Sequence, residues 1–218
     1  MIRSLCILFC LIYCGISGAQ SDSMTIEGYT RNFEFIKPVD LKPGASLVFV
    51  LHGSGGNGKG QMTSTKQFIS QVSNENVMLV YPTGYKNYWN ECRKEASSDA
   101  NKLDINEQAF FKSMIDYFTK NFKINTHHVF AVGTSGGGHM CYKLAMTMPG
   151  SIRAITAIIA NLPDTNNLDC ADATKALPVM IVNGTADPTN PYDGGYMGSP
   201  TFKMGNVRST ERSFAYWS

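Results

Sequence analysis

Ser135 lies in Gly133-Thr134-Ser135-Gly136-Gly137, directly after the apolar run Val129-Phe130-Ala131-Val132. A helix-like stretch follows at 139–148, so the serine stands on the strand-to-helix turn that Gly-x-Ser-x-Gly describes. Such a turn presents the hydroxyl above a sheet, where a base can remove its proton. The glycines at 136–138 disfavour an ordinary helix start, because each costs about 1 kcal/mol relative to alanine. The pattern predicts Ser135 as a nucleophile, rather than as an incidental serine in a glycine-rich turn.

An acidic partner is available at Asp187, just past the apolar run 179–182. This is the expected place for a carboxylate that orients a base histidine, although Asp187 could also simply make a turn before Pro188. Asp193 is a weaker alternative. On this type of turn the histidine follows the acid in the chain. All four histidines precede Asp187, so we expect a triad that lacks its base. His139, one helical turn after Ser135, fits a pocket wall or a solvated helix position better than it fits a base.

Acyl transfer also needs two backbone N–H groups aimed at the developing oxyanion. Gly136, next after the nucleophile, supplies one, and Ser54 in the segment 52–56, the oxyanion loop, supplies the other. We expect His52 to hold this loop by hydrogen bonds. The loop also matches G-x-G-x-x-G, but the next strand ends in Tyr81-Pro82-Thr83 without the acid that dinucleotide binding requires. Residues 53–59 also have the spacing of a phosphate-binding loop, but Gly60 replaces the Ser or Thr that such a loop requires.

Periodicity predicts the elements that position these residues. Apolar runs predict strands at 32–37, 46–51, 77–81, 127–132, 152–160 and 178–182, and helical spacing predicts helices at 61–72, 104–122 and 139–148. Asp104 is the expected helix cap, 84–100 is irregular, and a weak helix starts near 208. Strands that alternate with helices indicate an α/β fold with a mainly parallel sheet. No linker or repeat divides the chain, so we expect one domain at 20–218.

The first 19 residues have the features of a secretory signal peptide. Arg3 precedes the apolar stretch 5–16, and small residues allow cleavage near Ala19. A faint lipoprotein box at 11–14 is the less favoured alternative. The apolar stretch is short for a membrane span, so we expect a secreted protein, extracellular or periplasmic. The net charge is +2 and no basic run stands out, so we expect no nucleic-acid partner.

Cleavage would remove Cys6, Cys10 and Cys14 and leave Cys92, Cys141 and Cys170. An odd number in a secreted protein indicates either a missing partner or one free cysteine, for which Cys141 in the helix after Ser135 is the natural candidate. The sequence leaves both open. No C-x-x-C or H-x-x-x-H spacing is present, so no metal site is predicted.

At these residues the chain resembles the polyhydroxybutyrate depolymerase-like and feruloyl or acetylxylan esterase family of α/β-hydrolases. The resemblance covers roughly residues 45–218. The matching segments are Leu51-His52-Gly53-Ser54-Gly55-Gly56, Val80-Tyr81-Pro82-Thr83-Gly84 with Trp89-Asn90, Asp104-Ile105, the Ser135 turn with Tyr142-Lys143-Leu144-Ala145, Asn183-Gly184-Thr185-Ala186-Asp187, and Pro191-Tyr192-Asp193-Gly194-Gly195. Gly136 departs from the Asn or Ala usual after the nucleophile, but its N–H is unchanged.

The resemblance implies an α/β-hydrolase with helices on both faces of the sheet and a serine esterase without metal or organic cofactor. Its members continue beyond the point that corresponds to Ser218, and their catalytic histidine lies in that later part. We therefore expect the fold to lack its last strand and helix, the isolated chain to aggregate through an exposed sheet edge, and the oligomeric state to stay open.

Implied substrates are feruloyl or acetyl esters of xylan, and then aliphatic polyesters. Trp89, Tyr85, Tyr88 and His139 are candidates for the substrate pocket, although ordinary loop packing explains the aromatic residues equally well. The alternative function is an inactive homologue that binds carbohydrate or ester ligands without turning them over.

Overall fold

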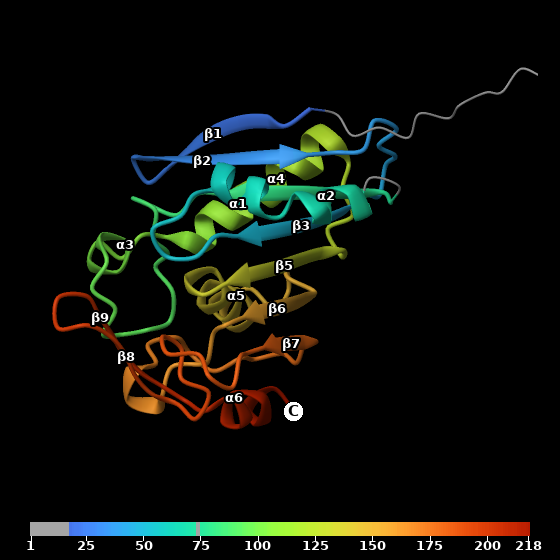
Figure 1. Ribbon diagram of the computed structural model, residues 1–218. Helices are drawn as coiled ribbons and strands as arrows, with labels where there is room; N and C mark the ends of the chain where they lie inside the picture. Colours follow the sequence, from blue (N-terminus) through green and yellow to red (C-terminus); the bar gives the residue numbers. More distant parts are fainter. Residues whose placement is uncertain (1–17, 73–74) are drawn as a thin grey trace, which may run out of the picture.

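The computed structural model describes residues 18–72 and 75–218. The predicted signal peptide therefore lies outside the described residues, apart from its last two positions. Seven strands form one sheet in the order β1-β2-β4-β3-β5-β6-β7 (Figure 1). The pairs from β4 to β7 are parallel, whereas β1 and β2 pair antiparallel at one side. The sheet confirms the predicted α/β class.

The strands of the sheet are β1 (Gln20–Ile26), β2 (Tyr29–Ile36), β3 (Ser46–Leu51), β4 (Val77–Pro82), β5 (Val129–Thr134), β6 (Ala154–Ile158) and β7 (Val179–Val182). A separate hairpin consists of β8 (Gly195–Gly198) and β9 (Lys203–Val207). The helices are α1 (Gly58–Ser64), α2 (Lys66–Val72), α3 (Asp99–Lys102), α4 (Glu107–Phe122), α5 (Gly136–Thr147), the 3-10 turn η1 (Thr165–Asn167) and α6 (Thr210–Trp217).

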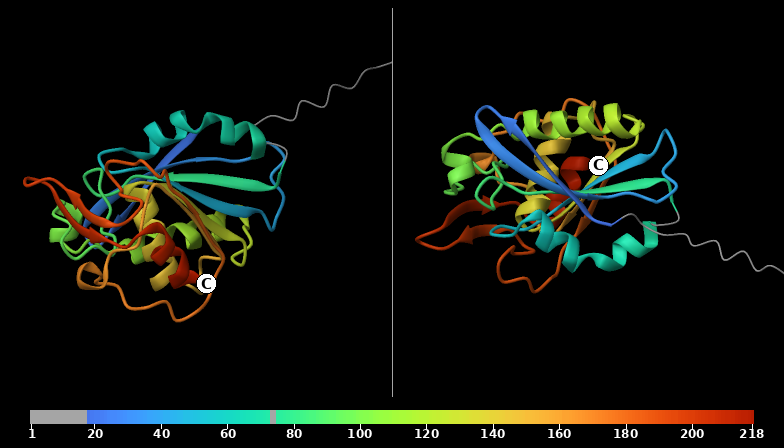
Figure 2. Two further views of the ribbon diagram at one scale, coloured as in Figure 1. Left: turned by 60° about the horizontal axis from the view of Figure 1, so that its bottom comes forward. Right: turned by 90° about the horizontal axis from the view of Figure 1, so that it is seen from above.

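The two faces of the sheet carry different helices. Helices α1 and α2 cover one face, and α4, α5 and α6 lie on the other (Figure 2). The core under α4 is aromatic: the Phe118 ring meets Phe33 and Phe35 edge to face, with centroids 5.8 and 5.2 Å apart. Each such ring buries about 150–250 Å² and favours this geometry. The aromatic stripe of α4 therefore fixes the antiparallel side of the sheet, while β3 and β5 are buried in its middle.

Several predicted boundaries were wrong in instructive ways. The helix expected at 61–72 is two helices, because the chain breaks at Thr65, whose N–H closes α1 on the Gln61 carbonyl. The α4 cap is Asn106, whose Oδ1 accepts from the N–H of Ala109 at 3.0 Å, whereas Asp104 is a turn residue with φ of 47°. The glycines at 136–138 lie inside α5 rather than before it. The sequence patterns also missed β1 and the β8–β9 hairpin.

Within the described residues, β7 has no strand on its outer side. Met180 and Val182 on this strand are 60% and 43% exposed. A strand at such an edge leaves backbone N–H and C=O groups without partners in the sheet. No helix in the described part of the chain is long and apolar enough to cross a membrane.

One disulfide crosses the molecule. Cys92, in the loop after β4, pairs with Cys170, between β6 and β7, and Cys141 is buried and free. For these three cysteines the interpretation with one free cysteine, Cys141, is therefore correct, and the interpretation with a missing partner is not. Burial in α5 raises the pKa of the Cys141 thiol, which keeps it protonated and unreactive.

Candidate active site

Ser135 occupies a strained position between β5 and α5. Its φ of 54° and ψ of −118° lie outside the regions that non-glycine residues favour, which costs about 1–3 kcal/mol. The turn is held because the N–H of Ser135 donates to the Ile158 carbonyl at 2.8 Å and the N–H of His139 donates to the Ser135 carbonyl at 3.0 Å. A strained serine on this turn is the geometry that the motif predicts for a nucleophile.

The glycines around Ser135 are required because other backbone segments pass too close to leave room for a side chain. A Cβ on Gly133 would lie 2.2 Å from the Gly137 carbonyl oxygen, and one on Gly137 would lie 2.5 Å from that of Leu51. We call the segment 133–138 the elbow. Because backbone atoms fill the space on each side, larger residues at these positions would force the strand and helix apart.

The oxyanion loop contacts the elbow. A Cβ on Gly136 would lie 2.9 Å from the backbone nitrogen of Ser54, so the two predicted donor residues are in contact. As the first residue of α5, Gly136 has an N–H without a carbonyl partner inside the helix. A carbonyl oxygen bound here would therefore meet backbone donors from two different segments.

His52 positions this loop rather than acting on substrate. Its Nδ1 contacts the Gly53 carbonyl at 2.7 Å, and its Nε2 accepts from the N–H of Gly84 at 2.9 Å. Accepting at Nε2 requires the neutral ring, with the proton on Nδ1. Burial, and secondarily the positive charge of Arg31, lowers the pKa of His52, in agreement with that state.

Trp89 braces the same loop. Its Nε1 donates to the His52 carbonyl at 2.9 Å, and its ring lies over the imidazole with centroids 4.8 Å apart. Trp89 and Tyr88 line a narrow cavity that also touches Ser54 and Gly136. Tyr85 packs on Tyr29 instead and is not part of this lining.

Asp187 lies in the loop after β7, which we call the acid loop (183–195). Its Oδ1 accepts from the N–H groups of Thr189 and Asn190 at 2.8 and 2.9 Å. Parallel pairing of β5, β6 and β7 brings the loops that carry Ser135 and Asp187 to the same end of the sheet, at the carboxyl ends of two strands that lie two strand spacings, or about 10 Å, apart. Asp193 is exposed in the turn before β8.

The loops after β6 and β7 are joined by side-chain amides. Asn183 Nδ2 donates to Asn161 Oδ1 at 2.8 Å, and the N–H of Asn161 donates to Asn190 Oδ1 at 3.2 Å. Because β6 also holds Ser135 through Ile158, this network connects the acid loop to the elbow. The sequence pattern did not single out these asparagines.

None of the four histidines is placed as a base between Ser135 and Asp187. His127 and His128 precede β5, at the opposite end of that strand from Ser135. His139 is buried in α5, and neither ring nitrogen makes a hydrogen bond within the described residues. Burial, and then the positive charge of Arg93, lowers the pKa of His139 well below the usual value. The nearby backbone of Asn161 favours the charged ring and so acts in the opposite direction, but it makes no hydrogen bond to either ring nitrogen. His139 is also absent from the lining of the cavity at Gly136.

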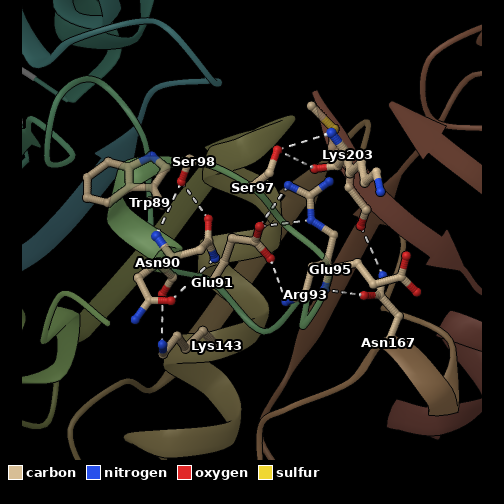
Figure 3. Close-up of polar contacts among 12 residues, drawn as sticks. Trp89, Asn90, Glu91, Arg93, Glu95, Ser97, Ser98, Lys143, Asn167 and Lys203 are labelled. Carbon is tan, nitrogen blue, oxygen red and sulfur yellow. Dashed lines mark hydrogen bonds and ion pairs between the residues drawn. The ribbon is translucent and has the colours of Figure 1, made fainter. Parts of the chain in front are cut away.

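The sequence analysis missed a buried ion pair beside this site. Glu91 and Arg93 flank Cys92 and both line the cavity at Ser54 and Gly136. Figure 3 shows the two side chains facing each other, next to the hydrogen bonds that tie their loop to Asn167 and Lys203. The sequence did contain a signal for this ion pair, namely opposite charges on either side of Cys92.

Comparison with known proteins agrees with this geometry. Residues 32–215 match the model of the phospholipase/carboxylesterase family. NocK of Nocardia uniformis subsp. tsuyamanensis, which carries an esterase's name, is 29% identical over 71% of this chain and 43% of its own. Feruloyl esterase C of Emericella nidulans is 24% identical over 73% of this chain and 55% of its own. The chain thus spans about half the length of these relatives.

Solved structures share the fold. The pOPH structure superimposes with a TM-score of 0.63 over 88% of this chain and 73% of its own, at 14% identity. A ferulic acid esterase superimposes with a TM-score of 0.52 over 70% of this chain and 64% of its own, at 15% identity. With the family model covering most of its length, the chain belongs to the phospholipase/carboxylesterase family of α/β-hydrolases.

Proposed function

We propose that this protein is a secreted serine carboxylic-ester hydrolase in which Ser135 attacks the ester carbonyl. The observation that carries the proposal is the strained Ser135 turn in contact with the Ser54 backbone. The N–H groups of Ser54 and Gly136 hold the oxyanion, and Asp187 orients the base histidine. Water then releases the acid from the acyl-enzyme, with no metal or organic cofactor.

In this proposal the base histidine comes from outside these 218 residues. His52 uses both ring nitrogens in the oxyanion loop, His139 is buried, and the other two stand at the far end of β5. The unpaired outer side of β7, beside the acid loop, is where a further strand carrying the base would pair. The single domain proposed for residues 20–218 carries the nucleophile, the two oxyanion residues and the acid.

The substrates we propose are feruloyl or acetyl esters of plant polysaccharides, or polyhydroxybutyrate-like polyesters. Relatives named feruloyl esterase and acetylxylan esterase/xylanase support the first class. A second candidate function, binding of carbohydrate or ester ligands without turnover, is favoured because none of the four histidines is placed to act as the base for Ser135. The two functions differ in whether Ser135 can be acylated.

Chemical rescue tests the nucleophile directly. The protein is incubated with p-nitrophenyl acetate with and without added imidazole, which can replace the missing base, and acetylation is mapped by peptide mass spectrometry. We expect imidazole-dependent acetylation at Ser135, loss of this signal in Ser135→Ala, and a weaker signal in Asp187→Asn. Acetylation of surface lysines that is equal in all three proteins is the internal control. No modification at Ser135 under any condition favours the binding function.

A further inference from the structure

The chain contains two Asn-Gly pairs, and the fold encloses one of them and leaves the other open. Asn57 caps α1 with Gly58 behind it, and Asn183-Gly184 begins the acid loop. In such a pair the backbone nitrogen of the glycine can attack the side-chain amide carbon of the asparagine, because glycine has no Cβ to hinder the approach. A bond forms between these two atoms, the side-chain nitrogen leaves as ammonia, and water opens the resulting succinimide to aspartate or isoaspartate. Either product carries a carboxylate where the amide was.

The first pair is protected by its surroundings. The N–H of Gly58 donates to Thr83 Oγ1 at 2.9 Å, and a Cβ on this glycine would collide with the Tyr81 carbonyl. The side chain of Asn57 is fixed as well, since its Oδ1 accepts from the N–H of Gly60 at 2.8 Å. Neither the attacking nitrogen nor the amide is therefore free to move.

The second pair has an open backbone and a restrained side chain. The N–H of Gly184 makes no hydrogen bond in the described part of the chain, and a Cβ there would meet nothing within 4 Å. Asn183 Nδ2 donates to Asn161 Oδ1 at 2.8 Å and to Thr210 Oγ1 at 3.0 Å. Its Oδ1 accepts from the N–H of Ala160 at 3.0 Å. Side-chain hydrogen bonds, rather than packing, hold this amide in place.

These hydrogen bonds stand where local opening is expected. Asn183 directly follows β7, which has no strand on its outer side among the described residues. It is half-buried, and Gly184 is exposed. Segments with few buried contacts and solvent-exposed hydrogen bonds open at a lower free energy than the packed core. Once the side chain of Asn183 is released, both the attacking nitrogen and water are at hand.

We propose that Asn183-Gly184 is a modification site, at which spontaneous deamidation loosens the acid loop from the loop after β6. An aspartate oxygen in place of Nδ2 has no proton to donate, so it would face Asn161 Oδ1 as a second acceptor. Asn161 in turn donates its N–H to Asn190 Oδ1, and the N–H of Asn190 donates to Asp187 Oδ1. The isoaspartate product also lengthens the backbone by one carbon, four residues before Asp187.

An effect on catalysis rests on the proposed function, because it runs through the role of Asp187 as the acid. The modification itself does not, since it needs only the chain and water. The two are therefore measured separately.

Peptide mass spectrometry on the folded protein tests the site. The whole chain is incubated in mildly alkaline buffer and digested, and chromatography separates the asparagine, aspartate and isoaspartate peptides. We expect conversion at Asn183 to be at least about tenfold faster than at Asn57 in the folded protein, and the two rates to become similar in urea. A sample that is digested without incubation corrects for conversion during handling.

Two variants identify the cause. Gly184→Ala adds a methyl group that fits the open space but hinders the attack, so conversion at Asn183 should fall about tenfold. Thr210→Val removes one acceptor from the Asn183 amide and should raise the conversion about fivefold. Asn57 in the same molecule is the internal control for general unfolding and should not change in either variant.

Three outcomes would overturn the proposal. They are equal conversion of the two asparagines in the folded protein, unchanged conversion at Asn183 in Gly184→Ala, and unchanged conversion in a folded Thr210→Val. If Thr210→Val fails to fold, Asn57 converts together with Asn183, and the comparison of folded with unfolded wild type decides.

Asn183→Asp tests what the modification does to the loop. We expect the backbone amides of Asn161 and Asn190 to exchange hydrogen at least about tenfold faster in this variant, with the amides of the elbow unchanged. Unchanged exchange at both asparagines would show that the carboxylate is accommodated, and would contradict the loosening.

The acylation assay at Ser135 distinguishes this result from the proposed function. Conversion at Asn183 without any acetylation of Ser135 supports the modification site and contradicts the hydrolase. Acetylation of Ser135 without conversion at Asn183 does the reverse.

Discussion

The elbow, which carries Ser135, and the acid loop, which carries Asp187, are held in place by different kinds of contact. The elbow is enclosed: a Cβ on Gly138 would lie 2.7 Å from the Ala160 Cβ, and Gly133 and Gly137 are equally crowded. The acid loop is open where it begins: a Cβ on Gly184 would meet nothing within 4 Å, and β7 before it has no strand on its outer side within the described residues. Packing fixes the nucleophile, whereas a few side-chain hydrogen bonds hold the acid.

This difference explains how the molecule keeps a strained serine only two strands away from the exposed strand β7. The backbone strain at Ser135 costs about 1–3 kcal/mol, and the crowded backbone of β3, β5 and α5 leaves it no room to relax. The first part of the acid loop, around Gly184, has no such enclosure, so its position depends on hydrogen bonds of Asn161, Asn183 and Asn190 and on the pairing of β7 with β6.

The largest expected effect comes from the disulfide that links the loop after β4 to the segment before β7. Cys92 follows β4 and Cys170 precedes β7, with 78 residues between them. In the chain-entropy model a loop of this length contributes about 4 kcal/mol. We expect Cys92→Ala/Cys170→Ala to lose about this much free energy of unfolding in urea, with Cys141→Ser as the free-cysteine control.

Hydrogen exchange on the same disulfide variant tests the comparison itself. The amides of β7 should lose more protection than those of β5, because the packing of the elbow remains. Equal losses in the two strands would show that both halves open together and would contradict the distinction.

Glycine substitutions compare the two halves at single positions. Gly137→Ala places a methyl group 2.5 Å from the Leu51 carbonyl oxygen and 2.7 Å from that of His52, and should destabilise by about 3 kcal/mol. The matched change Gly184→Ala in the acid loop has open space and should stay within about 0.5 kcal/mol. Thermal unfolding measures both, and a similar shift in the two variants would remove the contrast.

The free energy of unfolding should depend on pH through His139, which lies in α5 directly after the elbow. The pKa of His139 is lowered in the fold, so below about pH 6.5 the unfolded chain binds a proton that the folded protein excludes. The free energy of unfolding should therefore fall by about 1.4 kcal/mol per pH unit in that range, and be unaffected by this group above it. The groups that face the ring are Arg93, which disfavours the charged form, and the Asn161 backbone.

His139→Asn removes this titration and should give a shallower slope between pH 6.5 and 5.5 in urea unfolding. His52, whose pKa is also lowered, remains as a second source of slope in the variant. A variant slope equal to that of the wild type would show that His139 takes up a proton in the folded protein.

The same contrast explains what the sequence could reveal. The elbow was predictable because its glycines, its serine and the flanking apolar runs are local in the chain, and local sterics dictate them. Strand β1 was missed because it alternates polar residues on an exposed face, although Glu27-Gly28, with φ of 49° and 85°, marks the turn that joins it to β2. The hairpin β8–β9 has no apolar periodicity and is shaped by contacts to the loop at 93–98.

The residues of the site that were missed depend on long-range contacts. Glu91 and Arg93 pair two positions apart, but their loop is held in place by contacts to distant segments, among them the disulfide, the hydrogen bonds to Asn167 and the Ser97–Lys203 hydrogen bonds. The partner of Cys92 likewise lies 78 residues away. Neither spacing nor composition specifies which distant segment closes over a loop, so these features required the three-dimensional structure.

The smallest expected change in stability concerns the open edge. Met180→Lys on β7 alters a side chain that is 60% exposed, so the free energy of unfolding should change by less than about 0.5 kcal/mol. Self-association should nevertheless decrease, because a lysine on an unpaired strand opposes edge-to-edge pairing. Sedimentation velocity at increasing protein concentration measures this, with Leu103→Lys as the control, since Leu103 is 50% exposed but far from the edge in the α3 cap. Only Met180→Lys should lower the association if the β7 edge drives it. Equal effects of the two lysines would assign the association to general hydrophobicity, and the acid half would then be no more open than the rest of the surface.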